Sequence, residues 1–146
     1  MSRPNQSAIM QETLTILKPD TIQSGNAGAI IQMIETAGFR IRAARMLHLS
    51  REQAEGFYQV HRERPFFGDL VAFMTEGPVI AMVLEAEDAV ARLRHLMGAT
   101  DPARADADTV RRRFGGSIER NAIHGSDAPE TAAVEIAYFF SRLEQV

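Results

Sequence analysis

The sequence predicts an α/β fold, in which helices pack against one sheet. Short runs of β-branched and apolar residues alternate along the chain with stretches whose apolar residues recur at helical spacing. The predicted strands cover residues 13–17, 39–49 and 79–84, and helical segments lie between and after them. The order strand, helix, strand, two helices, strand, helix fits an α/β sandwich of the ferredoxin-like kind.

The predicted strands differ in their signals. In 13–17, β-branched residues are interleaved with leucines, and Pro19 ends the strand because proline cannot continue a ladder. In 39–49, apolar residues alternate with arginines, which indicates a half-buried strand, and Arg45 on its apolar face indicates a bulge or a buried salt partner. The run 79–84 is apolar without a break, so it predicts a central strand.

Capping signals and helical periodicity locate the helices. Gly38 closes the first helix as a C-cap, and Ser50 with Gln53 forms a capping-box pattern at the start of the second. Gly98 stops the helix that follows the third strand. The expected helices are 27–37, 51–61, a short one that ends near residue 75, 89–97 and 129–140.

The composition is that of an ordinary soluble globular protein. The 146 residues are 45% hydrophobic and 24% charged, and the net charge of −3 argues against a general nucleic-acid or membrane-surface binder. The chain has no cysteine, which excludes a disulfide framework and a thiolate metal site, and no apolar run approaches the roughly 20 residues that span a bilayer. We expect a cytoplasmic protein with a flexible N-terminal tail over 1–11 and a single domain over 12–146.

Lys18 is the only lysine among 16 basic residues, and it lies at the end of the first predicted strand. Strand ends are where site residues usually lie in an α/β layer. A flexible ammonium group acts as a point charge on phosphate, which arginine does not reproduce. The excess of arginine fits a compositional bias, but such a bias does not explain the position of this lysine.

The strongest chemical signal is Asn-Ala-Ile-His-Gly-Ser-Asp at 121–127. A neutral imidazole is nucleophilic near pH 7, and Gly125 leaves room for a bulky substrate beside the ring of His124. The Ser-Asp pair is expected to cap the last helix, with Glu130 completing a capping box, so the histidine lies before a helix start that favours anions. The alternative is a buried histidine beside an ordinary capped helix, and the flanking polar residues favour the nucleophile.

No periodic pattern marks residues 99–120. The part 104–120 carries five arginines against three carboxylates, so it is locally positive in an acidic chain. A loop of this length in a compact domain is usually functional. Three consecutive arginines occupy 111–113, and the sequence leaves open which of them faces a site.

Taken in order, five motifs resemble the nucleoside diphosphate kinase family. They are Leu-Lys-Pro-Asp at 17–20, Arg-Pro-Phe-Phe at 64–67, Glu-Gly-Pro at 76–78, Gly-Ala-Thr-Asp-Pro at 98–102 and the histidine motif at 121–127. The resemblance covers about residues 12–142, and the ordered set is highly specific. It implies a ferredoxin-like four-stranded antiparallel sheet, and a ping-pong transfer of the γ-phosphate of a nucleoside triphosphate to a nucleoside diphosphate through a phosphohistidine.

The resemblance also implies the site, residue by residue. The phosphohistidine falls on His124, the glutamate that orients its ring on Glu135, and the neighbouring hydroxyl on Ser126. The phosphate-binding set falls on Lys18, Tyr58, Arg94, Thr100, Arg111 and Asn121. The base site falls on Phe66 and Ile118, with Leu70 nearby. Mg²⁺ is expected to bridge the nucleotide's phosphates, without side-chain ligands.

The departures from the family lie in one segment. Ala107-Asp108 stands where relatives commonly have Pro-Gly, and Arg112-Arg113 stands where they commonly have Gly-Asp. The resemblance implies a homo-oligomer, either a tetramer or a hexamer built from dimers, and the altered segment commonly contributes to the larger assemblies. It further implies nucleoside tri- and diphosphates as partners, with no membrane and no specific nucleic acid. A base held by stacking exposes its flat face and not its edges, so base specificity is expected to be broad.

Other classes of function remain alternatives. A binding or scaffold domain could keep the fold without turnover, but the intact His124 and Lys18 argue against it. A single-stranded nucleic-acid binder could use 111–113, but no aromatic residues are interleaved with those arginines. A phosphorelay carrier would also use a nucleophilic histidine, but it would not need the ordered phosphate-binding set. Without the family, Tyr58 and Phe66 would be assigned to the core.

Overall fold

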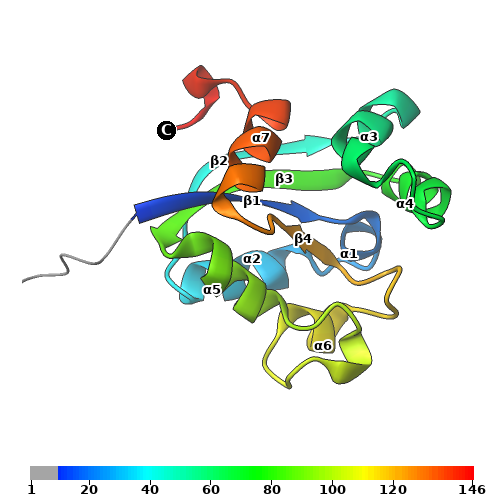
Figure 1. Cartoon of the computed structure of the whole chain (residues 1–146). Coiled ribbons are helices and arrows are strands. Elements are labelled where there is room, and N and C mark those ends of the chain that lie inside the picture. Colours follow the sequence, from blue (N-terminus) through cyan, green and yellow to red (C-terminus); the bar gives the residue numbers. More distant parts are fainter. Residues whose placement is uncertain (1–9) are drawn as a thin grey trace, which may run out of the picture.

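A four-stranded antiparallel sheet organises the chain, and its strands follow the order β2-β3-β1-β4 (Figure 1). The computed structural model describes residues 10–146. The strands are β1 (Met10–Leu17), β2 (Arg40–Leu47), β3 (Val79–Glu87) and β4 (Ile123–Gly125). The predicted sandwich is confirmed, and the apolar run that predicted a central strand forms β3.

Helices cover both faces of this sheet. In Figure 1, α7, α3 and α4 lie on one side, whereas α2, α5 and α6 lie on the other. The helices are α1 (Pro19–Gln23), α2 (Ala27–Thr36), α3 (Arg51–Phe57), α4 (Phe67–Met74), α5 (Ala89–Met97), α6 (Val110–Phe114) and α7 (Pro129–Phe139). Short 3₁₀ turns occupy Gln59–His61, Pro102–Arg104 and Arg142–Glu144. None of the helices in residues 10–146 has the length and apolar character needed to cross a membrane.

Two hydrophobic cores lie on opposite faces of the sheet. Ala81 and Val83 of β3 pack with residues of α3, α4 and α7, whereas Met82 and Leu84 pack with residues of α2 and α5. Successive side chains of a strand point to opposite faces, so a strand covered on both sides needs apolar residues at every position. This is why β3 lacks the polar alternation of an exposed strand.

The last two residues of the predicted tail belong to a strand. Residues 1–9 lie outside the described part of the chain, but Met10 and Gln11 belong to β1, where Met10 is opposite Glu87. The side-chain oxygen of Gln11 accepts a hydrogen bond from the N–H of Val90 at 2.9 Å. The first turn of a helix has N–H groups without helical partners, so Gln11 caps α5 from the neighbouring strand.

The structure only partly matches the prediction for Arg45, which pairs in regular register with Ala81 of β3. The register of β2 against β3 shifts between Ile41 and Ala43, so the bulge is at Arg42, three residues before Arg45. Arg45 Nη1 donates to the carbonyl of Phe139 at 2.9 Å and lies 3.7 Å from a carboxylate oxygen of Glu144. Both charged side chains are more than two-fifths exposed, so the salt partner is at the surface and not buried.

The segment 99–120 is not irregular throughout. The short helix α6 lies inside it, and Thr109 caps this helix by accepting a hydrogen bond from the N–H of Arg112 at 3.3 Å. A helix of five residues has too few turns to show a periodic pattern in the sequence. Thr109, two residues before the first of the three arginines, was the one signal in the sequence that could have located the start of this helix.

Candidate active site

His124 lies on the edge strand β4, and not directly before a helix as predicted. It is opposite Ile16 of β1, and Thr15 Oγ1 donates to the carbonyl of His124 at 2.8 Å. Its neighbours Ile123 and Gly125 are buried, whereas the side chain of His124 is 18% exposed. The sheet therefore holds the histidine backbone rigidly while its ring reaches the surface of a cleft.

The imidazole of His124 is oriented by a carboxylate. His124 Nε2 lies 2.9 Å from Glu135 Oε1, and Ser126 Oγ donates to the same oxygen at 2.7 Å. Partial burial raises the pKa of the Glu135 carboxyl, but hydrogen bonds from His124 and Ser126 outweigh this effect and hold that pKa below its ordinary value. An ionised carboxylate accepts a proton donor, so we assign the ring proton to Nε2, which leaves the lone pair on Nδ1.

The predicted cap of the last helix is wrong. Ala128 is the N-cap of α7, and its N–H donates to Thr131 Oγ1 at 3.0 Å, so the cap uses neither Ser126, Asp127 nor Glu130. The extended backbone of β4 continues to residue 125, and the chain needs the next residues to turn into the helix. The polar side chains of the motif remain available for the site.

Gly125 also has a different role from the one predicted. A Cβ atom at this position would overlap the sulfur of Met97 and would lie 3.1 Å from Leu93 Cδ2. Both residues belong to α5, so the missing side chain lets this helix pack closely on β4. The glycine makes room for a helix and not for a substrate.

Lys18 and Asn121 form a buried pair beside the histidine strand. Lys18 Nζ donates to Asn121 Oδ1 at 2.8 Å, and Asn121 Nδ2 donates to the carbonyl of Thr100 at 3.2 Å. Burial lowers the pKa of Lys18 to about 8; the charge of Arg111 acts in the same direction and that of Asp20 opposes it. The lysine therefore remains mainly protonated at pH 7 but loses its proton in mildly alkaline solution.

Among the three consecutive arginines, the structure selects Arg111. Its Nη1 donates to the carbonyl of Gly98 at 3.1 Å and its Nη2 to that of Ile123 at 2.9 Å. Burial lowers the pKa of Arg111 to about 10, and the charge of Arg94 acts in the same direction. Arg112 is exposed.

One cleft of about 480 Å³ lies between α3, α5, β4 and α7, and Lys18, Asn121 and Ser126 are not part of its lining. The predicted residues that line it are Tyr58, Arg94, Thr100, Arg111, His124 and Glu135. The Tyr58 hydroxyl is buried and has no hydrogen-bond partner within residues 10–146, and burial, followed by the charge of Glu135, raises its pKa. It is thus a neutral donor. Arg94 Nη1 forms an ion pair of 2.8 Å with Asp127, an exposed residue that was not predicted in this role.

The predicted base-site residues do not line this cleft. Phe66 is 46% exposed and Ile118 is 53% exposed, and Leu70 packs against the core formed with α7. The nearest link is the ring of His61, which lines the cleft and lies 5.4 Å from the Phe66 ring, centroid to centroid. The roles of Phe66, Ile118 and Leu70 stay predictions.

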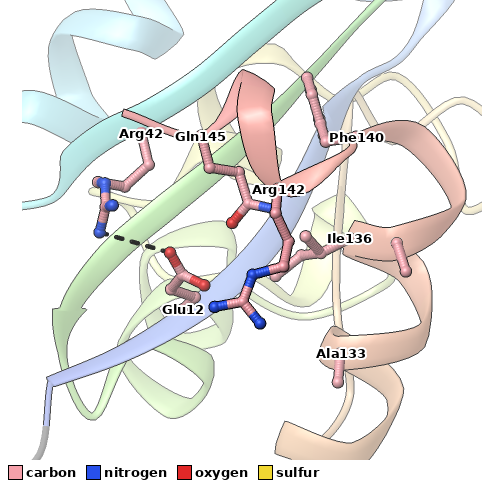
Figure 2. A pocket seen from close by; sticks show the side chains of 8 residues that line it. Glu12, Arg42, Ala133, Ile136, Phe140, Arg142 and Gln145 are labelled. Carbon is pink, nitrogen blue, oxygen red and sulfur yellow. Dashed lines mark ion pairs between the residues drawn. The ribbon is translucent and has the colours of Figure 1, made fainter.

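A second hollow of about 500 Å³ also borders α7 (Figure 2). Its lining includes Ile136 and Phe140, Arg142 and Gln145 of the C-terminal segment, and Glu12 and Arg42 from the strands β1 and β2. It contains no histidine, and Glu12, the single acid in its lining, lies 3.5 Å from an arginine of β2. It offers no nucleophile, so the chemistry belongs to the cleft around His124.

An oriented histidine beside buried cationic groups, on a ferredoxin-like sandwich, defines a phosphotransferase. A sequence model described as nucleoside diphosphate kinase matches residues 11–145. The chain belongs to the nucleoside diphosphate kinase family, which confirms the predicted family and enzyme class.

Relatives and solved structures agree over nearly the whole chain. A nucleoside diphosphate kinase of Chlamydia pneumoniae is 57% identical over 137 residues, which are 94% of this chain and 95% of the relative. One of Maricaulis maris is 60% identical over 132 residues, 90% of this chain and 94% of the relative. The Aquifex aeolicus enzyme superposes with a TM-score of 0.93 at 45% identity, covering 94% of this chain and 100% of its own. The Halobacterium salinarum enzyme in complex with CDP superposes with a TM-score of 0.90 at 39% identity, covering 94% of this chain and 92% of its own.

Proposed function

We propose that this enzyme carries the transferred phosphoryl group on Nδ1 of His124. The observation that supports this most directly is the hydrogen bond between His124 Nε2 and Glu135, 2.9 Å long. It leaves Nδ1 with a free lone pair on a ring that lines the cleft. The enzyme activity of the family then follows from two successive in-line displacements at one nitrogen.

In the first displacement, Nδ1 attacks the γ-phosphorus of a nucleoside triphosphate. The bond from phosphorus to the bridging oxygen breaks, and the nucleoside diphosphate leaves with that electron pair. The ring now carries a positive charge, which the Glu135 carboxylate stabilises across the Nε2 proton. In the second displacement, a terminal oxygen of another nucleoside diphosphate attacks the same phosphorus, the N–P bond breaks, and neutral His124 is restored.

We assign charge neutralisation to Arg94, Arg111 and Lys18. Phosphoryl transfer asks mainly for positioning and for stabilisation of charge on the phosphate oxygens. Arg111 is held by backbone carbonyls and is preorganised, whereas Arg94 must exchange Asp127 for a phosphate oxygen. We further propose that the hydroxyls of Tyr58 and Thr100, two residues that line the cleft, donate to phosphate, and that Asn121 holds Lys18.

Mg²⁺ is proposed to arrive on the nucleotide. This ion keeps several waters and is usually held by one or two carboxylates together with substrate phosphates. The rim of the cleft offers carboxylates only at Asp127 and Glu130, besides Glu135 inside it, and Asp127 is already paired. This donor set fits an ion bound mainly by phosphates, where it would neutralise phosphate charge.

A base site at Phe66 and Ile118 is supported by their exposure. Large apolar side chains that remain about half exposed are suited to stack on a flat ring. Stacking leaves the base edges unread, so we propose broad acceptance of purines and pyrimidines. Leu70 lies one helical turn after Phe66, and we propose that it supports the Phe66 ring.

Assembly into a homo-oligomer is likewise a proposal. β2 is an edge strand, and its residues Ala44, Arg45 and Met46 are exposed. An unpaired strand edge is a ready surface for a second copy of the chain. We propose a dimer as the basic unit and a tetramer or hexamer as the full assembly; a cytoplasmic location stays a prediction.

The proposal is tested by intact mass after mixing with ATP and Mg²⁺. The wild type is expected to gain one acid-labile phosphate and to lose it when a second nucleoside diphosphate is added. His124→Gln should gain none while still binding nucleotide, which is checked by thermal shift. Substantial exchange by that variant would show that another group carries the phosphate.

A further inference from the structure

The residue that joins Asn121 to the histidine strand has an unusual backbone. Ala122 has φ of +76°, in a region that residues with a side chain rarely adopt, and the N–H of Ile123 donates back to the carbonyl of Asn121 at 2.9 Å. A hydrogen bond from residue i+2 to residue i with such a φ is a classic γ-turn, which is rare and strained. Ala122 is fully buried, so the surrounding structure must hold it there.

The turn is held by the segment that begins α1. The N–H of Ala122 donates to Asp20 Oδ2 at 3.0 Å, and its carbonyl accepts from the N–H of Lys18 at 2.9 Å and from Thr21 Oγ1 at 2.8 Å. Both polar groups of the strained residue are therefore satisfied by residues about a hundred positions earlier in the chain. Two of these contacts come from the side chains of Asp20 and Thr21.

The side chains that meet beside this turn belong to the proposed site. Asn121 precedes it and contacts Lys18 Nζ, and His124 follows two residues after it. A relaxed backbone at Ala122 would change the direction of the chain between Asn121 and His124. The turn therefore sets how the lysine-asparagine pair lies relative to the histidine ring.

Resting on the proposed site, we propose that Asp20 and Thr21 are positioning residues: they hold the strained turn at Ala122, which places Asn121 and Lys18 beside His124. Asp20 is placed here at a cost, because its second carboxylate oxygen, Oδ1, is buried without a partner within residues 10–146. A buried, unpaired polar atom disfavours folding. A cost of this kind is expected where the contact serves the site.

The test uses glycine at position 122. Glycine adopts positive φ without steric conflict, so a turn with glycine needs less external restraint. Asp20→Ala is expected to lower kcat/KM about tenfold in the parent enzyme, with the loss mainly in kcat, but only about threefold when combined with Ala122→Gly. Asp20→Asn keeps an acceptor oxygen for the N–H of Ala122 and should recover most of the activity. Asp108→Ala, which removes an exposed acid elsewhere, serves as the matched control.

A second pair of variants tests the hydrogen bond from Thr21 Oγ1 to the carbonyl of Ala122. Thr21→Ser keeps the hydroxyl and Thr21→Val removes it at nearly constant volume, so only the valine variant should lose kcat. All variants are measured at a temperature where circular dichroism shows them folded. A residue with a merely structural role would lower the melting temperature and leave kcat of the folded enzyme unchanged.

The outcomes separate the inference from the function on which it rests. Equal losses for Asp20→Ala with alanine or glycine at 122, or unchanged kcat for both Asp20→Ala and Thr21→Val, would overturn the positioning role. If Asp20→Ala does not fold, the comparison of Thr21→Val with Thr21→Ser decides alone. Phosphate exchange by His124→Gln would overturn the proposed site itself. If His124→Gln loses exchange while Asp20→Ala and Thr21→Val keep a normal kcat, only the positioning role is overturned.

Discussion

At the scale of single residues, the Glu135 carboxylate has two hydrogen-bond donors that share one oxygen. His124 Nε2 and Ser126 Oγ both contact Oε1, and Ser126 Oγ is also 3.4 Å from the N–H of Leu14 on β1. The serine thus links the glutamate to the sheet that carries the histidine. The carboxylate can compensate the positive ring without moving, which is the condition for electrostatic stabilisation of a transition state.

We predict that Glu135→Ala slows the formation of phosphohistidine about a hundredfold, because the ring loses both its orientation and its compensating charge. Ser126→Ala should cost less than about tenfold, because it removes one neutral donor and leaves the ring contact in place. Rapid-quench measurement of a single turnover with ATP compares the two variants. An equal loss in both would mean that the hydroxyl, and not the carboxylate charge, controls the ring.

A second residue-scale prediction concerns pH. Burial lowers the pKa of Lys18 from 10.5 to about 8, so its ammonium group is lost as the pH rises through about 8. We expect kcat/KM to fall as the pH rises through about 8, which gives the pH–rate profile an alkaline limb. Asp20→Asn should move this limb to lower pH, because the charge of Asp20 favours the ammonium form.

The stability of the fold changes with pH in the opposite direction. Between pH 8 and 10.5 the unfolded chain binds the proton that the folded chain has released, so this group's contribution to the free energy of unfolding rises with pH.

The pH prediction is checked by rate profiles from pH 6 to 10 together with urea denaturation at the same values. Lys18→Ala should have low activity and no limb near pH 8. A limb at the same pH in Lys18→Ala would assign it to another group.

At the scale of elements, α5 and β4 are packed at contact distance. Gly125 leaves space for the side chains of Met97 and Leu93, and the same helix carries Arg94 to the rim of the cleft. A change in the spacing between helix and strand therefore moves a cationic group relative to the histidine.

We predict that Gly125→Ala destabilises the fold by about 1–3 kcal/mol through overpacking, and that it lowers kcat. Met97→Ala alone should also destabilise, by leaving a cavity. The double variant should be more stable than the sum of the two single losses implies, because the new methyl group enters the space left by the methionine. Urea denaturation of all four proteins measures this coupling, and strict additivity would mean that the two residues do not contact.

Two adjacent arginines of α6, Arg111 and Arg112, are expected to differ in function, because the first is buried and the second is exposed. Arg111→Ala should cost about 2 kcal/mol of stability and most of the activity, because it leaves the carbonyls of Gly98 and Ile123 without their donors and removes a cation from the cleft. Arg112→Ala, at an exposed position, should stay within about 0.5 kcal/mol and be nearly silent in kinetics. Greater damage from Arg112→Ala would reverse the assignment.

What the sequence predicted at this scale was local. The capping box of Ser50 and Gln53 and the stop at Gly98 involve residues a few positions apart, and both occur in the structure. The packing role of Gly125 and the burial of Arg111, and not of Arg112, depend on contacts with residues from other elements. The amino acids next to them in the sequence do not reveal these contacts. The cap of α7 was wrong because Ser126 and Asp127 resemble capping residues, although they bind Glu135 and Arg94.

At the scale of the whole molecule, assembly is the main open prediction. The altered segment with Arg112 and Arg113 adds exposed positive charge where symmetric copies are expected to meet. We predict a dimer that persists at all salt concentrations and a larger assembly that depends on salt, because salt screens like charges. Light scattering at low and high salt tests this, and a stable monomer under every condition would contradict it.

The strand order β2-β3-β1-β4 places the histidine strand β4 and the other edge strand, β2, at opposite ends of the sheet. If two copies join through β2, their active sites lie far apart, because β3 and β1 separate β2 from β4 in each copy. Coupling between sites requires an element with two arrangements that both sites bias, and a continuous sheet with both faces packed offers none. The subunits should therefore turn over independently, with a Hill coefficient of about 1 for every nucleotide, whatever the size of the assembly.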